Sequence, residues 1–555
     1  MTSDATNNAA ERRAPALRRR LLSLLPLLCA ALLLLSSVAN EPAWDDLFFL
    51  SRPGPGAGLH PMQLFTLPFW QQSAFVNTPL VDFWRPLSSV LLWLTGYMTG
   101  AHPAAFRLLA ILCAALAAAG VGRLAARTAG PGEGRSIGIA AASLYAIHPL
   151  SVEVTCMAVN ISDHLAIACL CGATITVLKM REQNAGALPY AVLFLLCAAA
   201  CTAKEFGVMC ALLPLFLLPG RRPAASVPLF RRRMVFTTVA CALPALLYLT
   251  GRHVVMAAAG GPSIGDVASL DAPLAPLAGL GIGLLQIPLP VLRGAHFYLP
   301  SDGPVPLIAG LATAAGLAGL VVHLVRRRTE GGPATGIAVA ILLALPSLLV
   351  VPAVGDTHRF PLRYFAVSLA AVLALSLPLV GERWRRPGKK LFAPVFVLLA
   401  LLSMVRMGEW RTHLSFVRAE AEIHQTSAFE QLNYGSALLA LRRFDEARVV
   451  LDLARRGDGI DEPASRSRLL SCDAELAAHA DGDPARASSL IRQAMALQPS
   501  DLRHVLDLAD YRAMAGHPEE SLAMLEEALA SPRFTPHQKT ALPDRIRFYQ
   551  QRSRP

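Results

Sequence analysis

Two adjacent carboxylates, Asp45 and Asp46, follow the first long apolar run of this 555-residue chain. A carboxylate just outside a membrane can act as general base on a hydroxyl group. It can also hold a divalent cation that neutralises a phosphate leaving group. An acidic pair by itself also marks an ordinary loop, so the pair predicts chemistry only in the company of other polar residues on the same side.

Such companions fall at the ends of predicted membrane spans, on the same face as the acidic pair. They are Arg85, His148, Glu153, Asp163 with His164, Lys204, Glu205, Arg359, and Arg363 with Tyr364. Ionisable groups at a membrane boundary are costly and are therefore functional candidates, and arginine and lysine suit a phosphate. Snorkelling or ordinary interfacial pairing is the alternative for each residue. Lys204 is the sharpest candidate, because it lies in a short turn between two apolar runs.

The composition shows which elements must position these residues. The chain is 54% hydrophobic and 16% charged, whereas a soluble domain carries about 25% charged residues. Long apolar runs exclude a soluble globular enzyme, and the apolar fraction excludes intrinsic disorder. The net charge of +12 is first a matter of membrane topology rather than of nucleic-acid binding. The ten cysteines lie mostly in apolar runs and show no disulfide framework or metal-binding spacing.

The apolar runs predict an all-α fold, a polytopic membrane helix bundle of about eleven spans over residues 1–410. The first span covers 21–39, and a cleaved signal peptide is the alternative for it. The other expected spans are 105–126, 137–149, 164–178, 188–200, 208–218, 234–257, 306–325, 337–351, 364–380 and 391–404.

Lysine and arginine alternate in number from loop to loop, which predicts an orientation with the N-terminus in the cytoplasm. The loops rich in these residues contain Arg18–Arg20, Arg123 with Arg127 and Arg135, Lys179 with Arg181, Arg231–Arg233, Arg326–Arg328, and Arg383–Lys390. The first outside loop, 40–104, contains a semi-apolar stretch, Pro86–Met98, that suits an interfacial helix. Leu284–Leu292, which contains two prolines, is expected to be re-entrant or interfacial.

The segment 411–555 has a soluble composition and an internal period. Turn residues followed by a small residue recur, and the markers Ala447, Ala487 and Ser521 lie 34–40 residues apart. This is the period of paired-helix tetratricopeptide repeats, whose stacked pairs form a surface for extended peptides. We expect about three repeats in a TPR-like α-solenoid; an irregular helical bundle is the alternative.

The order of these motifs resembles the GT-C superfamily of integral-membrane glycosyltransferases. The chain is most similar to the transmembrane and tetratricopeptide-repeat O-mannosyltransferase group and its bacterial relatives. The matching pieces are Trp44-Asp45-Asp46, Arg85-Pro86-Leu87, His148-Pro149 with Glu153, Asp163-His164, Lys204-Glu205, Arg363-Tyr364, and the repeats after the last span.

The resemblance implies roles for individual residues. Asp45 would be the base that deprotonates an acceptor hydroxyl, and Asp46 would orient the acceptor or a metal. Arg85, Lys204 and Arg363 would hold the phosphate of the donor. The remaining candidates would contact sugar or acceptor: His148, Glu153, Asp163, Glu205 and Tyr364. A divalent cation is a possible cofactor, with its ligands left open.

The expected function is transfer of a single, mannose-like sugar from a polyprenyl-phosphate donor to a hydroxyl of an outer-face protein. The expected location is a bacterial inner membrane, with the repeats in the periplasm binding a polypeptide acceptor or an assembly partner. No nucleic-acid partner is expected. Two alternatives remain: an enzyme that modifies a lipid or cell-envelope glycan, and a non-catalytic scaffold whose repeats do the work.

Overall fold

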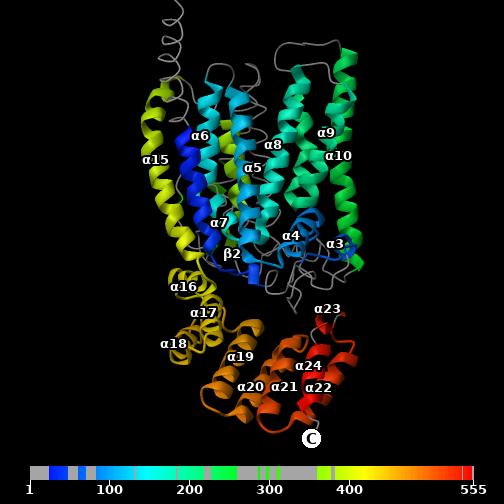
Figure 1. The fold of residues 1–555 in the computed structure, drawn as a ribbon, viewed down its shortest axis with the longest axis vertical. Helices are drawn as coiled ribbons and strands as arrows, with labels where there is room; N and C mark the ends of the chain where they lie inside the picture. The colour runs from blue at the N-terminus through cyan, green and yellow to red at the C-terminus, as the bar shows by residue number, and fades with distance from the viewer. Residues whose placement is uncertain are drawn as a thin grey trace, which may run out of the picture. The chain divides into compact units, whose positions relative to one another are not determined.

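The computed structural model describes residues 24–47, 61–69, 83–129, 133–182, 186–217, 227–258, 285–287, 290, 296–298, 308, 311–312, 315, 359–376, 382–534, 536–540 and 542–552. The chain divides into two compact units. The first consists of Met1–Gln72 with Leu80–Arg411, and the second of Ser73–Pro79 with Thr412–Pro555. Helices dominate both units, which confirms the helical character expected from the sequence (Figure 1).

The first unit opens with the helical segment Leu24–Ala39, which ends in the 3-10 turn η1 (Ser36–Ala39). Its other helices are α3 (Gln63–Thr66), α4 (Pro86–Thr99), α5 (Pro103–Ala129), α6 (Gly134–Ile147), α7 (Pro149–Cys156), η3 (Ala158–Asn160), α8 (Ile161–Glu182), α9 (Ala187–Ala203), η4 (Glu205–Leu217), α10 (Val227–Ala258), η6 (Leu362–Phe365), α14 (Ala366–Ala371), η7 (Val372–Ser376) and α15 (Glu382–Glu409).

Four helices among the described residues are long and apolar enough to cross a membrane. They are Pro103–Ala129, Ala158–Arg181, Phe230–Ala258 and Lys390–Glu409. A fifth span results if α6 and α7, which meet at a bend of 54°, are taken together. Shorter apolar helices cover Leu24–Ala39, Ala187–Ala203 and Glu205–Pro214. The expected spans 337–351 and most of 306–325 lie outside the described residues, so the total of about eleven stays a prediction.

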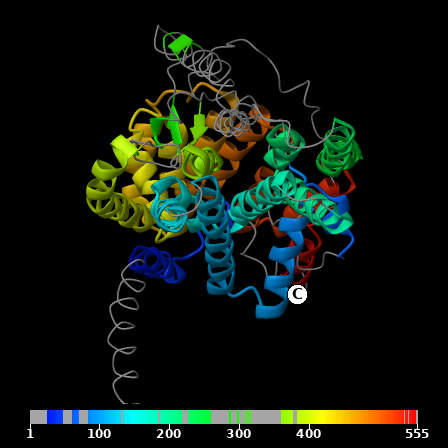
Figure 2. The same ribbon diagram turned by 90° about the horizontal axis from the view of Figure 1, so that it is seen from above.

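Helix α5 is central to the packing of this unit, since it contacts α4, α6, α7 and α8. Figure 2 shows these helices from above, along the bundle. The outer side of α5 exposes Leu108, Leu112 and Leu116 at a spacing of four residues. Its inner side buries small side chains such as Ala110 and Ala117. Apolar side chains outside and small ones inside are expected of helices that pack in lipid.

Glycines set the distance between α5 and α6. A Cβ added to Gly122 would lie 2.7 Å from the carbonyl oxygen of Gly138, and a Cβ on Gly138 would lie 2.6 Å from the carbonyl oxygen of Gly122. The two backbones therefore touch at this point, which no other residue type allows.

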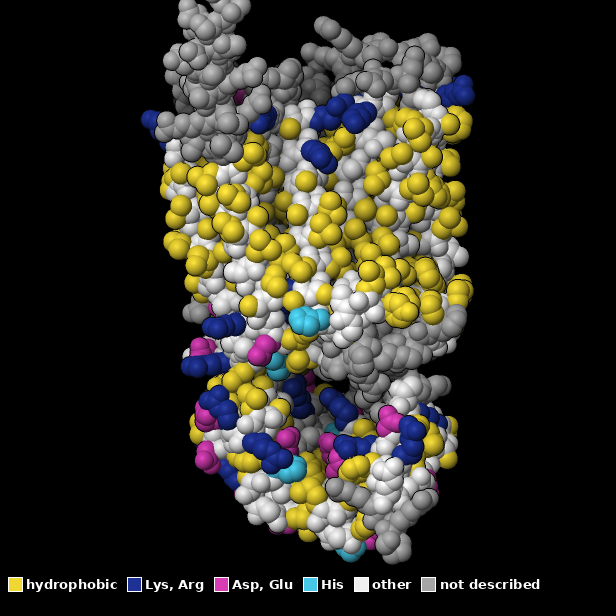
Figure 3. All heavy atoms as spheres, viewed as in Figure 1, with side chains coloured by type: hydrophobic (Ala, Val, Ile, Leu, Met, Phe, Trp, Pro, Cys, Tyr) yellow, Lys and Arg dark blue, Asp and Glu magenta, His cyan; other side chains and the backbone are white. Residues whose placement is uncertain are grey.

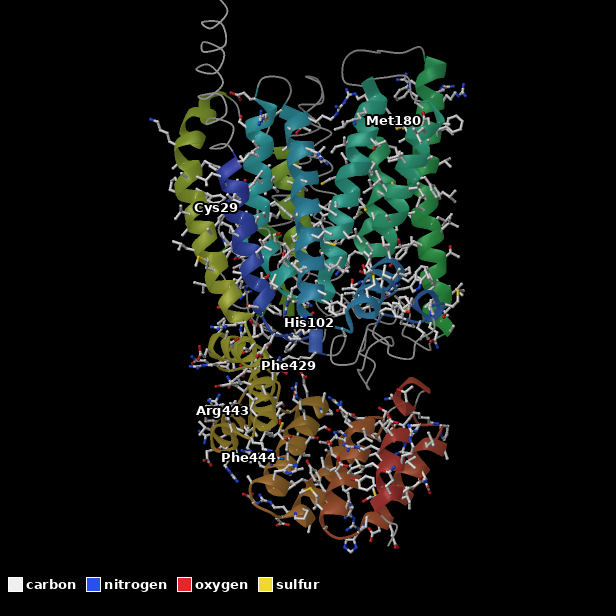
Figure 4. The ribbon with its side chains drawn as sticks, in the orientation of Figure 1. Cys29, His102, Met180, Phe429, Arg443 and Phe444 are labelled. Atoms are coloured by element: carbon white, nitrogen blue, oxygen red, sulfur yellow. The ribbon has the colours of Figure 1, made fainter. Side chains whose placement is uncertain are left out.

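The two ends of the bundle differ in their charges. Arg123 and Lys179 lie near the ends of α5 and α8, and Arg231 lies near the start of α10. Figure 3 shows an apolar belt over the unit, with lysine and arginine side chains at its upper end. In the same orientation, Figure 4 places Met180 toward that end and His102 at the other. Among the described residues, the cations of three of the loops expected on one face, Arg123, Lys179 and Arg231, thus lie at one end of the bundle.

Two short strands interrupt the helical pattern. Strands β1 (His296–Tyr298) and β2 (Arg359–Pro361) pair antiparallel, with Phe297 opposite Phe360. The turn η6, which carries Arg363 and Tyr364, follows β2 directly. Strands of three residues are too short to show an alternation of apolar and polar residues, so the sequence predicts an all-α fold without them.

The second unit is a succession of antiparallel helices in its described residues. They are α16 (His413–Ile423), α17 (Ala428–Ala440), α18 (Phe444–Ala454), α19 (Pro463–His479), α20 (Pro484–Leu497), α21 (Leu502–Met514), α22 (Pro518–Ala530), α23 (Pro536–Lys539) and α24 (Leu542–Arg552). Side chains of Ser427, Asp483 and Asp501 accept backbone N–H groups at the starts of α17, α20 and α21. These caps satisfy donors that have no partner inside the helix.

A common turn joins the helices of each pair. The turns before α18, α20 and α22 each contain a residue with positive φ: Arg442, Gly482 and Gly516. Figure 4 labels Arg443 and Phe444 at the first of these turns. The small residues Ala447, Ala487 and Ser521 are all fully buried, and each lies five positions after the residue with positive φ. The three turns therefore share one register.

Candidate functional site

The acidic loop, residues 40–47, joins the first helical segment to the remainder of the first unit. Its backbone is held by two local hydrogen bonds, from the Asp46 N–H to the Ala43 carbonyl at 3.1 Å and from Leu47 to Trp44 at 3.0 Å. Trp44 has φ of 54°, a left-handed conformation that costs a bulky residue about 1–3 kcal/mol. Asp45 follows this residue and is half-buried.

Asp46 is completely buried and is surrounded by hydrogen-bond donors. Its Oδ2 accepts the N–H of Ala158 at 3.1 Å, and its Oδ1 accepts the N–H of Val159 at 3.0 Å. These N–H groups belong to η3, which joins α7 to α8, so the carboxylate caps the backbone at this break. Burial raises the pKa of Asp46, while Arg107 and the two N–H groups oppose that rise.

Arg107 completes the surroundings of Asp46. Its Nη2 lies 3.1 Å from Asp46 Oδ2 and donates to the Glu41 carbonyl oxygen at 2.8 Å. The side chain is 1% exposed and comes from the second turn of α5. Arg107 was not among the sequence candidates, although it lies at the start of the expected span 105–126; an ionisable residue at the end of an apolar run was the available signal.

Glu153 forms a second buried ion pair near the same break. Arg406 of α15 donates to Glu153 at 2.9 Å and to Glu409 at 2.7 Å. Arg363 is buried and lies within electrostatic range of Glu153. The side chain of Tyr364 lies outside the described residues. Arg406 lies two residues after the expected span 391–404 and was also not among the sequence candidates.

These side chains form one group, which we call the Asp46 cluster: Asp46, Arg107, Glu153, Arg363 and Arg406. Cys156, at the end of α7, interacts electrostatically with Asp46, Arg107, Glu153 and Arg406. The two ion pairs therefore both lie near the last turn of α7.

Lys204 and its neighbours form a second group, the Lys204 cluster: Arg85, Asp163, Lys204 and Glu205. Lys204 follows the last residue of α9 and donates to Asp163 Oδ2 at 2.9 Å. Arg85, just before α4, donates to both carboxylate oxygens of Glu205 at 2.8 and 3.0 Å. Arg85 and Lys204 lie close enough to interact electrostatically. The four residues, predicted from three separate motifs, thus come together.

Aromatic rings support Arg85 in this position. Its guanidinium lies 4.2 Å from the ring centroid of Phe83 and 5.4 Å from that of Phe69. The neighbouring Trp84 stacks on Tyr248 of α10 with a centroid separation of 5.5 Å. A guanidinium held between rings and a carboxylate has one orientation, which is what bidentate recognition of a phosphate requires.

His148 has a structural contact on each ring nitrogen. Its Nδ1 accepts the N–H of Leu150 and so caps α7, while its Nε2 lies 3.0 Å from the carbonyl oxygen of Ile287. This pattern fits a neutral imidazole that donates through Nε2. Its neighbour in the sequence motif, His164, is likewise enclosed, between the hydroxyls of Tyr145 and Thr155 at 3.0 and 2.9 Å.

The connection from α7 to α8 links the two clusters. Ala158 and Val159 bind Asp46, and Asp163, four residues further on, binds Lys204. Both clusters lie at the starts of α5 and α8 and at the ends of α9 and α15. They therefore occupy the end of the bundle opposite to the lysine- and arginine-rich end.

No group of three or more histidine, cysteine, aspartate or glutamate side chains with metal-binding geometry occurs among the described residues. The acidic loop offers two adjacent carboxylates, of which Asp46 is already bound to Arg107 and the backbone. No protein-family model, curated protein or solved structure matches this chain.

Proposed function

We propose that this chain is a membrane glycosyltransferase of the GT-C type. It transfers a single, mannose-like sugar from a polyprenyl-phosphate donor to a hydroxyl group of an outer-face protein. The observation that carries the proposal is the acidic loop, in which a half-buried Asp45 is adjacent to a fully fixed Asp46. Asp163 of the Lys204 cluster lies in the first turn of α8, four residues after Val159, which binds Asp46.

In the proposed reaction Asp45 accepts the proton of the acceptor hydroxyl as its oxygen attacks the anomeric carbon of the donor sugar. The bond from that carbon to the phosphate oxygen breaks, and the lipid phosphate leaves with the negative charge. A single displacement of this kind inverts the anomeric configuration. Arg85, Lys204 and Arg363 stabilise the charge that develops on the phosphate, which is the usual work of preorganised cations.

Buried cations favour a phosphate over an uncharged ligand. Arg85 is 5% exposed, Lys204 2% and Arg363 9%, so an incoming phosphate would meet them in a medium of low dielectric constant, where charge interactions are strong. Glu205 and Asp163 hold two of these cations in place. We infer that the carboxylates orient the cations and neutralise them while no donor is bound.

Helices α17–α22 supply about three tetratricopeptide-like repeats in this proposal. The supporting observations are the paired helices, the shared register of the turn with positive φ, and the burial of Ala447, Ala487 and Ser521. The repeats would recruit the polypeptide acceptor. By the positive-inside rule, the end with the Lys204 cluster faces the periplasm of a bacterial inner membrane and the N-terminus is cytoplasmic.

The test is transfer of radiolabelled sugar from a polyprenyl-phosphate donor by the full chain in nanodiscs. We expect Asp45→Asn to reduce turnover by about 10³-fold or more, because the general base is lost. The matched control is Glu41→Gln, which neutralises an exposed carboxylate of the same loop and leaves transfer unchanged. Persistent transfer by Asp45→Asn rejects the assignment of the base, and loss on addition of EDTA would show a metal requirement.

Acceptor class is tested by deleting residues 419–555. Loss of glycosylated protein together with retained modification of lipid would support recruitment of polypeptides by the repeats. Unchanged protein glycosylation would contradict that role, and the lipid or envelope-glycan alternative predicts product only in the lipid fraction.

A further inference from the structure

We propose that Arg107 is a positioning residue for the transfer reaction, acting by closing the acidic loop and fixing Asp45. This inference rests on the proposed function of Asp45 as base. The contact set that leads to it involves no sequence-derived candidate except Asp46.

Arg107 joins the two ends of the loop through one nitrogen. Nη2 donates to the carbonyl oxygen of Glu41 and pairs with the carboxylate of Asp46. These partners are five residues apart in the chain, so the guanidinium closes the segment between them. Both side chains of the ion pair are essentially inaccessible, at 1% and 0% exposure, and a buried pair with additional hydrogen bonds has a fixed geometry.

Asp46 in turn ties the closed loop to a rigid support. Its two bonds to Ala158 and Val159 fix it against the break between α7 and α8, and α5 contacts both α7 and η3. The loop is thus anchored on α5 by Arg107 and on the connection to α8 by Asp46. Three independent groups converge on a single carboxylate beside the proposed base.

The backbone of Trp44, within the anchored loop, has a strained left-handed conformation. A non-glycine residue with φ of 54° persists only where surrounding contacts over-determine the conformation. Trp44 lies between the two partners of Arg107, Glu41 and Asp46. Release of the guanidinium would let Trp44 relax to negative φ, and that rotation would swing the following residue, Asp45, away from its position.

The alternative role for a buried arginine in this enzyme is direct contact with the donor phosphate. The two roles differ in their kinetic signature. A contact with donor raises KM for the donor when it is lost, whereas a displaced base lowers kcat and leaves donor binding intact. A displacement of about 1 Å costs about 10²-fold in rate.

The test compares Arg107→Gln and Arg107→Lys with Arg123→Gln, which removes an exposed arginine from the other end of the same helix. The full chain in nanodiscs is assayed for kcat, donor KM and hydrogen exchange. We expect Arg107→Gln to lower kcat about 10²-fold with unchanged donor KM, and to accelerate exchange at the amides of Asp46 and Leu47. Arg107→Lys keeps a cationic nitrogen on a side chain one bond shorter, so its kcat should lie between those of Arg107→Gln and the parent chain. Arg123→Gln should have the kcat and the exchange rates of the parent chain.

A double variant separates action through Asp46 from independent action. If Arg107 acts through Asp46, the double variant Arg107→Gln with Asp46→Asn should have a kcat no lower than that of the slower single variant. A kcat reduced by the product of the two single losses would overturn the proposal. A raised donor KM, or unchanged exchange in the loop, also overturns it. If Arg107→Gln fails to fold, Arg107→Lys carries the same comparisons. Absence of transfer by the parent chain refutes the proposed function, while the exchange measurement still decides whether Arg107 closes the loop.

Discussion

Lys204 donates to Asp163 across a 2.9 Å contact that joins the end of α9 to the first turn of α8. Each side chain is 3% exposed, and the two residues are 41 positions apart. The pair therefore serves the packing of two helices and also holds the cation proposed to meet the donor phosphate. These two roles are separable by experiment.

Removal of Lys204 alone should destabilise the protein. In Lys204→Met the buried carboxylate of Asp163 loses its cation, and breaking a buried pair in this way costs about 3–5 kcal/mol. We expect a lower midpoint of thermal unfolding in detergent and, under the proposed function, no transfer. The double variant Lys204→Met with Asp163→Leu removes both charges and should recover most of the stability. Transfer that recovers together with stability would contradict a role for Lys204 in donor binding.

Arg85→Lys should weaken donor recognition more than it weakens folding. Lysine keeps the charge but cannot bind both oxygens of Glu205 while covering the Phe83 ring. In donor binding, lysine also lacks the second bond that a guanidinium makes to a phosphate. Loss of one such charge-assisted bond, about 1.5–3 kcal/mol, corresponds to a rise in donor KM of about 10- to 100-fold. The measurement is KM for the polyprenyl-phosphate donor, with Arg411→Lys, an exposed arginine, as control. An unchanged KM would remove Arg85 from the donor site.

The sequence predicted the character of the fold better than its details. Apolar runs indicated membrane helices, and α5, α8, α10 and α15 contain helical segments that are long and apolar enough to cross a membrane. The motif pairs Arg85 with Glu205 and Lys204 with Asp163 could not be predicted, because pairing depends on how each helix is rotated about its axis. Arg107 and Arg406 were not predicted for a related reason: their carboxylate partners, Asp46 and Glu153, lie on other elements.

The local backbone conformation could not be predicted from the sequence either. Nothing in Trp44-Asp45-Asp46 signals a left-handed backbone, since tryptophan rarely adopts it and the contacts that impose it come from α5 and η3. The segment Val208–Leu218, expected as a span, forms the 3-10 helix η4 with Pro214 inside it. Gly207 lies so close to the end of α9 that an added Cβ would be 2.1 Å from the Ala200 carbonyl oxygen.

Arg442→Gly should stabilise the second unit. Arg442 has φ of 56° where the two equivalent turns use glycine, and this conformation costs a residue with a Cβ about 1–2 kcal/mol. Since glycine also loses more backbone entropy on folding, we expect a net gain of about 0.5–1 kcal/mol. Chemical denaturation followed by exchange at α17 and α18 measures it. Gly516→Ala should have the opposite effect; stabilisation by both changes would show that the turn is not under strain.

Raising the pH from about 4 to about 7 should destabilise the second unit. Burial, reinforced by Asp510, raises the pKa of Asp507 to about 7, above the value of about 3.9 in an unfolded chain. The protonated carboxyl therefore favours the folded state, and this contribution is lost progressively as the pH rises from about 4 to about 7. Hydrogen exchange at α21 should accelerate over that range, after correction for intrinsic rates, and change little at higher pH. Asp507→Asn should abolish that change, and an equal change in the variant would assign it to another group.

The backbone contact between Gly122 and Gly138 fixes the tilt of α5 against α6. Gly122 lies fifteen residues from Arg107 on one continuous helix, a distance of about 22 Å at 1.5 Å per residue. A methyl group added at this contact forces the two helices apart there, and a rigid helix transmits the resulting tilt to its far end. Under the proposed function, a substitution at Gly122 or Gly138 would therefore disturb the acidic loop from the opposite end of α5, without any contact to it.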